Sequence, residues 1–199
     1  MSWGLAEEAG KAARWLAARD FPAVEMLARL LAANDGRSYS DMAPAITGDR
    51  WRAPGGDLCP VCCGAALGDR IEALSRGHAV RLVGLTCPLL LAPFLDRAWP
   101  SDDVSCEIRW PNVRLVLTAN SVTLESDKAS AHLSDRADEV EVSFGAHRST
   151  VPAHQPRVGG IATPRSAWHA IDALAKRTYV PASDESRARG AGAGRTDND

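Results

Sequence analysis

The sequence lacks the features that mark membrane-bound, secreted and nucleic-acid-binding proteins. Its formal net charge is −2, so it has no basic excess to bind a phosphate backbone or an anionic membrane surface. Its longest apolar run, Pro88–Leu95, is interrupted by Pro93 and is too short to cross a bilayer. The N-terminus carries Glu7 and Glu8 where a signal peptide would carry basic residues before an apolar stretch. We therefore expect a cytoplasmic protein that binds neither nucleic acid nor membranes.

Cysteine usage argues against the disulfide-rich secreted class. There are 5 cysteines, an odd number, and their spacing is irregular. A secreted disulfide scaffold is shorter and carries paired cysteines. Reduced thiols in a cytosolic protein fit this pattern better. The residues are Cys59, Cys62, Cys63, Cys87 and Cys106.

The composition that is present is that of an ordinary globular domain. The chain has 199 residues, of which 45% are hydrophobic and 24% are charged. A chain of this length can bury about 70% of its unfolded surface around one core. From Pro181 onward no apolar residue is larger than alanine. We expect one domain over residues 1–180 and a flexible tail over residues 181–199.

Alternating polarity in the middle of the chain predicts an antiparallel sheet. In the first predicted strand Cys106, Ile108 and Trp110 point to one face, and Glu107 and Arg109 point to the other. Short connections join the first three strands, which makes them antiparallel neighbours. The four predicted strands are Val104–Trp110, Val113–Thr118, Val122–Ser126 and Glu139–Phe144.

Helical segments precede and follow this sheet. Residues 2–18 and 23–33 have apolar residues at helical spacing, and the stripe of the first is mostly alanine. The last helix begins after Thr163-Pro164, and its shared face comprises Trp168, Ile171, Leu174 and Ala175. A sheet with one dry face needs an apolar cover. We therefore predict an α+β fold, with a meander over about residues 104–144 covered on one face by the N- and C-terminal helices.

The stretch from Asn34 to Asp57 is polar and rich in glycine and proline, and its apolar residues follow neither a helical nor a strand periodicity. We predict a surface loop pinned by Trp51, its only large anchor. Loops of this length inside a domain tend to be functional or mobile.

Cys59-x-x-Cys62 is the sharpest local pattern in the sequence. A structural zinc site usually needs a second ligand pair, and the remaining candidates are isolated from one another, so we expect no metal. A redox dithiol should begin a helix that follows a strand, and the segment before Cys59 is not strand-like. The simplest interpretation is that small thiols pack like alanine beneath the sheet.

The chemical alternative makes Cys59 a nucleophile. It would lie just before a helix N-terminus, where the helix dipole lowers the pKa of a thiol. His78 and Asp69 are the nearest base and orienting carboxylate along the sequence. The candidate catalytic set is therefore Cys59, His78 and Asp69, although nothing in the sequence brings the three together in space.

Two further features are candidates for ligand binding. The Gly-Ala-Gly-Ala-Gly stretch at 190–194 lacks the flanking strand, helix and Gly-Lys-Ser/Thr of a phosphate loop. A tail that folds over a cleft would instead place three charged side chains there: Arg187, Arg189 and Asp197. His147 and His154 fall in one irregular stretch, where a two-histidine metal site is conceivable, but loop histidines are more often plain surface residues. No cofactor is implied.

Each end of the chain carries a distinctive stretch: Ser-Trp-Gly-Leu-Ala-Glu-Glu-Ala-Gly-Lys-Ala at 2–12, and Arg-Thr-Tyr-Val-Pro-Ala-Ser at 177–183 with the Gly-Ala repeat and the final Thr-Asp-Asn-Asp. These two stretches resemble a family of uncharacterised bacterial proteins. Members of that family often carry one more helical segment ahead of the Ser-Trp-Gly stretch, so we expect this chain to begin late. The family has no established activity, and the resemblance implies no catalytic residues.

These observations favour an accessory or binding protein without catalysis of its own, acting through a partner enzyme or as an oligomer. No catalytic constellation is complete, and the first helix offers an alanine-rich face for close packing. The alternative is a small thiol-dependent enzyme acting on a polar metabolite, with Cys59 as nucleophile and the tail as a lid. The partners implied are another protein, a second copy of this chain or a small polar metabolite.

Overall fold

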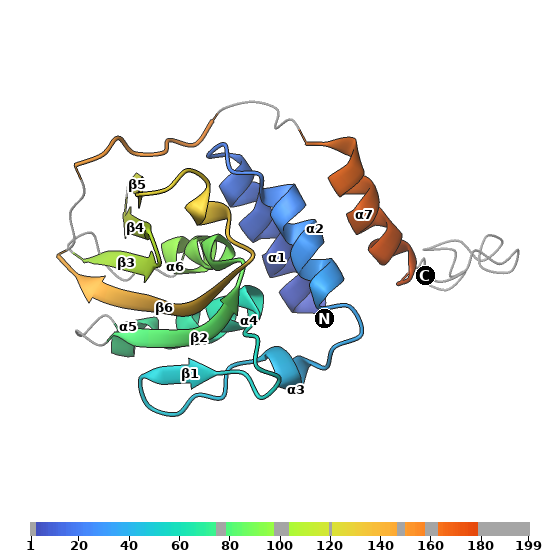
Figure 1. Ribbon diagram of the computed structural model, residues 1–199, viewed down its shortest axis with the longest axis horizontal. Helices are drawn as coiled ribbons and strands as arrows, with labels where there is room; N and C mark the ends of the chain where they lie inside the picture. The colour runs from blue at the N-terminus through green and yellow to red at the C-terminus, as the bar shows by residue number, and fades with distance from the viewer. Residues whose placement is uncertain are drawn as a thin grey trace, which may run out of the picture.

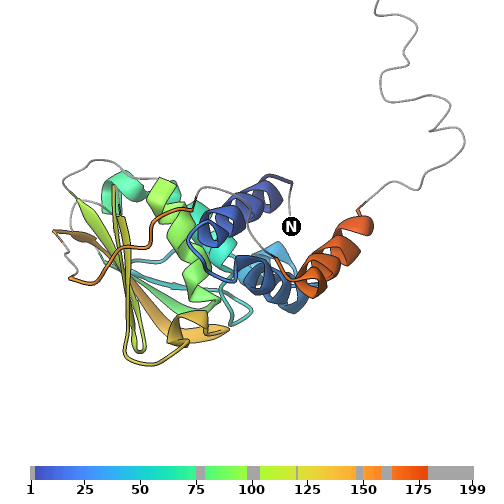
Figure 2. The same ribbon diagram turned by 90° about the horizontal axis from the view of Figure 1, so that it is seen from above.

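A six-stranded mixed sheet forms one layer of the protein, and helices form the other (Figures 1 and 2). The computed structural model describes residues 3–74, 79–97, 104–119, 121–146, 150–157 and 163–178. The strands are β1 (Arg50–Arg52), β2 (Val80–Thr86), β3 (Ser105–Trp110), β4 (Val113–Thr118), β5 (Ser121–Ser126) and β6 (Arg136–Gly145). The α-helices are α1 (Trp3–Ala17), α2 (Ala23–Ala33), α3 (Tyr39–Met42), α4 (Pro60–Gly68), α5 (Ile71–Leu74), α6 (Ala92–Arg97) and α7 (Arg165–Lys176), and two 3₁₀ turns are η1 (Pro88–Leu91) and η2 (Ala131–Leu133).

The strand order is β1-β2-β6-β3-β4-β5. The predicted α+β class and the antiparallel character of the central strands are confirmed, with one parallel pair between β1 and β2. Strands β3, β4 and β5 form the predicted meander, but β6 returns to pair with β3 instead of extending the sheet beyond β5. Three hairpin-linked strands with the fourth beside the first make a Greek key. The longer connection through η2 between β5 and β6 permits this return.

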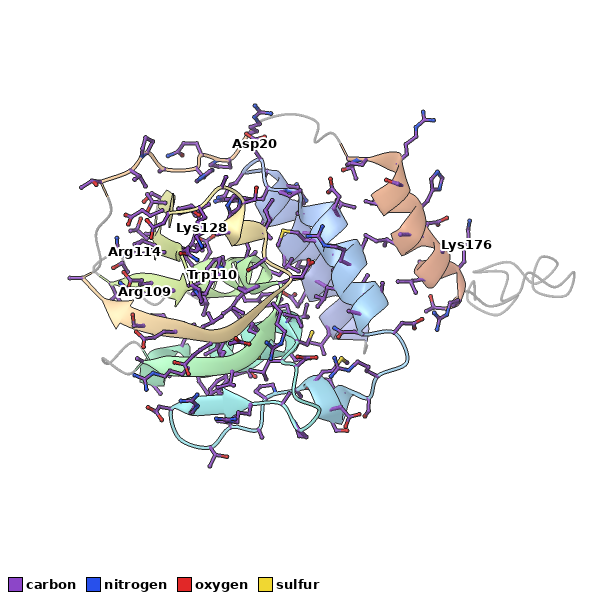
Figure 3. All side chains as sticks on the ribbon, in the orientation of Figure 1. Asp20, Arg109, Trp110, Arg114, Lys128 and Lys176 are labelled. Atoms are coloured by element: carbon purple, nitrogen blue, oxygen red, sulfur yellow. The ribbon has the colours of Figure 1, made fainter. Side chains whose placement is uncertain are left out.

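The two faces of the sheet differ less in burial than the alternating polarity of the strands predicts. Cys106, Ile108 and Trp110 are buried on the helix side, as expected. On the opposite face, however, Glu107 is also buried, with 5% of its surface exposed. The Nη2 of Arg109 lies 2.6 Å from one Glu107 oxygen, and the Nε of Arg114 lies 2.5 Å from the other. Figure 3 shows both arginines on the β3–β4 part of the sheet. Long arginine side chains thus pair with a carboxylate that the sequence pattern assigned to solvent.

Small residues bring the helices close together on the inner face. Ala9, Ala12 and Ala13 of α1 are buried in the core, which confirms that this alanine stripe is packed. The indole Nε1 of Trp15 donates a 2.6 Å hydrogen bond to a carboxylate oxygen of Asp96, which ties α1 to α6. Helix α6 contacts the sheet at β4, while α7 lies on α2 and so forms a further layer on the side away from the sheet (Figure 2).

The long stretch before α4 is more ordered than the sequence suggests. It contains α3 and β1, and β1 adds to the sheet in parallel with β2. Trp51 is its anchor, as predicted: the side chain is fully buried, and its Nε1 donates to the carbonyl oxygen of Gly48. The sequence missed β1 because a three-residue edge strand is too short to show alternation.

Residues 150–157 cross the edge of the sheet and reach the end of α1. The backbone N–H of His154 donates to the carbonyl of Val122 in β5, and that of Arg157 donates to Ala18. The Arg157 guanidinium also pairs with Asp20 at 2.9 Å, and Figure 3 shows Asp20 where this segment passes α1. Among the described helices, none combines the length and apolar character that crossing a membrane requires.

Candidate functional site

Strand β2 sets the position of Cys59 through its neighbour Leu58. The N–H of Leu58 donates to the carbonyl of Gly84, and its own carbonyl accepts from both the N–H and the hydroxyl of Thr86. Leu58 therefore pairs with β2 as a parallel bridge. The segment between β1 and Cys59 is not a strand, as expected, but the single bridge at Leu58 leads the chain from the sheet into α4.

The approach of Leu58 to β2 requires glycine at position 84. Gly84 has φ +72°, and a Cβ placed there would lie 2.5 Å from the carbonyl oxygen of Gly56. A residue with a side chain would be strained in that backbone conformation and would push the 53–58 segment away. The close contact between this segment and β2 thus depends on Gly84 having no side chain.

Cys59 is the N-cap residue of α4, and Pro60 occupies the first position of the helix. The backbone of Cys59 is extended, as expected for an N-cap, and its N–H donates to the carbonyl of Met42 at 3.1 Å. Proline at this position is compatible with the helix because its missing N–H would have had no partner there. The predicted location of Cys59 at a helix N-terminus is what the structure shows.

Hydrogen-bond donors converge on the Cys59 sulfur and lower the pKa of its thiol to about 7. The largest contribution is a hydrogen bond from the Cys62 thiol. The backbone N–H groups of Val61 and Cys62 favour the thiolate further without closing a full capping hydrogen bond. The side-chain amide of Asn34 donates to the sulfur at 3.6 Å. Burial acts in the opposite direction, and the donors outweigh it.

The other thiols are held in their neutral form. Donation to Cys59 and burial both raise the pKa of Cys62, so the proton of the pair resides there. Burial raises the pKa of Cys63 and of Cys106, and raises that of Cys87 to about 11. All five cysteines are free and buried, which confirms the expectation that they pack in the core. Cys59 therefore differs from the other four in its chemistry, although it shares their burial.

The structure does not bring Asp69 to Cys59. Asp69 is the C-cap of the helix that Cys59 begins, and nine helical residues separate the two by about 14 Å. The helix whose N-terminus favours the Cys59 thiolate thus keeps this carboxylate at its far end. His78 lies outside the described residues, and so do His147 and the tail residues Arg187, Arg189 and Asp197.

Two histidines from different elements meet at Phe21, a pairing that the sequence did not reveal. The ring of His154 lies 4.9 Å from that of Phe21, and the ring of His132 lies 6.0 Å from it. Burial, and then the nearby His154, lower the pKa of His132. Within the described ranges, no three histidine, cysteine or acidic side chains gather where they could hold a metal ion.

Helix α7 has a different exposed face from the one predicted. Ala167 is its buried residue, and Ile171 packs against the core, but Trp168 is 62% exposed. Trp168 and His169 line a shallow depression with Thr163 and Arg165. The prediction that Trp168 shares the packed face is wrong: α7 lies on α2 with Ala167 buried and Ile171 against the core, and this orientation leaves Trp168 in solvent.

Comparisons with known proteins agree with the N-terminal part of the resemblance described above. Residues 1–59 match the model of a family described as a protein of unknown function (DUF3726). The matched segment runs through α1, α2, α3 and β1 and ends at Cys59. No curated protein and no solved structure matches the chain. Over its first 59 residues the chain is therefore similar to a family of uncharacterised proteins, as expected.

Proposed function

We propose that this is a cytoplasmic accessory protein that acts through the thiol of Cys59 and does not turn over a substrate of its own. The observation that supports this function best is the convergence of the Cys62 thiol, the Asn34 amide and the first N–H groups of α4 on the Cys59 sulfur. A thiolate, and not a thiol, is the nucleophile in cysteine chemistry. With a pKa of about 7, Cys59 is partly in that form at neutral pH.

The surroundings of Cys59 favour an accessory role over catalysis. Its surface is only 1% exposed, and among the residues that the structure describes, the groups that approach its sulfur are hydrogen-bond donors and none of them can serve as a base. Covalent catalysis needs a nucleophile with a base in reach and space for the substrate. Five reduced cysteines also fit a reducing compartment such as the cytoplasm.

The second candidate function is a small thiol-dependent enzyme that acts on a polar metabolite. The perturbed pKa of Cys59 favours it, because catalytic nucleophiles share this property. The tail residues Arg187, Arg189 and Asp197 remain the proposed ligand-binding groups of such an enzyme. In this case the tail would close over the substrate.

The thiolate content of the folded protein tests the shared part of both candidates. Thiolates absorb in the far ultraviolet, so a pH titration needs no reagent to reach the buried sulfur. The difference between the natural chain and Cys59→Ser should titrate near pH 7. The difference for Cys106→Ala, the matched control, should lack any step near neutral pH because burial raises the pKa of that thiol. A Cys59 difference identical to the control would contradict the proposal.

Protection from alkylation separates the accessory protein from the enzyme. The natural chain is treated with iodoacetamide at neutral pH, with and without the small-molecule fraction of a cell extract, and Cys59 is followed by peptide mapping. An accessory protein should show equal rates in both samples. Slower alkylation in the presence of metabolites would indicate a bound substrate and favour the enzyme.

A further inference from the structure

We propose that Cys59 and Cys62 form a reversible intramolecular disulfide, with a hydroperoxide as the oxidant. This inference rests on the proposed function, since it assigns the partner thiol and the reactant class of the same Cys59. It makes the first turn of α4 a modification site.

The first turn of α4 places the two sulfurs as neighbours. Cys59 is the N-cap and Cys62 is the third residue of the helix, and the side chains of these two positions face each other across the first turn, as they do in a capping box. The Cys62 thiol is also the group that lowers the pKa of Cys59 most, by favouring its thiolate as a hydrogen-bond donor. The fold thus brings the two thiols to the same turn before any oxidation takes place.

Cys62 is a better resolving thiol than Cys63. One residue further along the helix turns the side chain by about 100°, away from the face that Cys59 caps. Cys63 is fully buried, and its N–H donates to the backbone carbonyl of Cys59 at 2.9 Å. Of the two thiols, that of Cys62 is the one that lowers the pKa of Cys59.

The reaction balances without any further reactant. The Cys59 thiolate attacks one oxygen of the hydroperoxide, the O–O bond breaks, and the leaving oxygen takes a proton to depart as water or an alcohol. Cys59 is then a sulfenic acid. Cys62 loses its proton to the departing hydroxyl, attacks the Cys59 sulfur and releases water. Two thiols are oxidised to one disulfide, and the peroxide is reduced by two electrons.

Burial selects the class of oxidant. Cys59 is 1% exposed and Cys62 is 4% exposed, so a disulfide-bearing peptide cannot align with either sulfur while α4 is in place. Hydrogen peroxide is small and uncharged, and it crosses such a layer through minor fluctuations of the surface. Asn34 and the backbone carbonyl of Met42 are the groups that this layer places against Cys59.

The test treats the reduced full-length chain with one equivalent of hydrogen peroxide at neutral pH, and blocks the remaining thiols. Residues 53–70 carry Cys59, Cys62 and Cys63 on one tryptic peptide, because Arg52 and Arg70 flank it. The natural chain and Cys63→Ala should lose two thiols and two hydrogens from this peptide, and a thiol reductant should restore both. Fragmentation of the natural peptide after partial reduction identifies the pair without any variant.

Cys62→Ser is the deciding variant, because serine keeps a hydrogen donor beside Cys59 but cannot form the disulfide. It should stop at the sulfenic acid, trapped by dimedone, and form disulfide at least about tenfold more slowly. Equal disulfide formation in Cys62→Ser, or a pair that includes Cys63, would overturn the assignment. If Cys59 titrates near pH 7 and no disulfide forms, this inference fails alone. If Cys59 titrates in the ordinary range, the proposed function fails as well.

Discussion

Replacing Gly64 by alanine tests the packing that holds α4 and its cysteines in place. Gly64 lies in the middle of α4 and is buried against Phe94 of α6. A Cβ at position 64 would lie 2.5 Å from Cδ2 and 2.8 Å from Cβ of Phe94, and closer still to Cγ. Real Cβ atoms do not approach carbon this closely, so one helix must move. Rotating the phenyl ring cannot remove the contact with the Phe94 Cβ, which is fixed to the backbone.

The magnitude follows from two opposing effects. Alanine favours the helix over glycine by about 1 kcal/mol, while overpacking a dense core costs about 1–3 kcal/mol and occasionally more. The contacts at position 64 are close enough to place the cost at the upper end. We expect a net loss of about 2 kcal/mol in the free energy of unfolding, or about 4–8 °C in Tm.

Gly10→Ala is the matched control, because Gly10 is a helical glycine with no atom near its Cβ position. The control should gain up to about 1 kcal/mol in urea denaturation, where Gly64→Ala loses stability. Phe94→Ala alone leaves a cavity, but combined with Gly64→Ala it should cost less than the sum of the two single changes. A Gly64→Ala protein as stable as the natural chain would refute the packing at this contact.

Three further changes test other parts of the structure. The pKa of His132 is lowered in the folded state, so the folded protein binds fewer protons than the unfolded chain. The free energy of unfolding should therefore fall as the pH drops below about 6.5. His132→Gln should reduce this pH dependence, as measured by urea denaturation at several pH values. Glu107→Gln leaves two arginines around a buried neutral group and should lower the free energy of unfolding by about 3 kcal/mol. Glu125, which also pairs with Arg114, is more exposed, so Glu125→Gln should lower it by less than about 1 kcal/mol in the same assay. Asn34→Ala removes the 3.6 Å donor to Cys59 and should raise the pKa of that thiol by less than about one unit, measured by far-ultraviolet titration; a pKa that does not rise would contradict the role of the amide.

Local patterns were enough to predict the elements of the central sheet. Alternation identified β3, β4 and β5, and helical spacing identified α2 within its observed bounds. Those signals act over a few residues, so they do not depend on the rest of the fold. The return of β6 to β3 depends instead on where a connection through η2 can reach, and alternation carries no information on that distance.

The candidate site was only partly predictable for the same reason. The position of Cys59 before a helix is local, and proline at the first helical position is compatible with that start. The contribution of Asn34 comes from the end of α2, and no spacing rule connects it to Cys59. Leu58 pairs with β2 through a single bridge, which is shorter than any pattern can detect. Asp69 is near Cys59 in the sequence, but the helix between the two residues holds them at its opposite ends.

The bare backbone at Gly84 has a consequence for a residue in another segment. The pairing of Leu58 with β2 holds Cys59 at the start of α4. It is possible because Gly84 has no Cβ, so the main chain of β2 can contact the main chain at Gly56. Alanine at 84 would leave every cysteine unaltered and still shift the sulfur relative to its donors. The lowered pKa of the Cys59 thiol therefore depends on a glycine that does not contact it. An inspection of the cysteines alone would not identify position 84 as important for their chemistry.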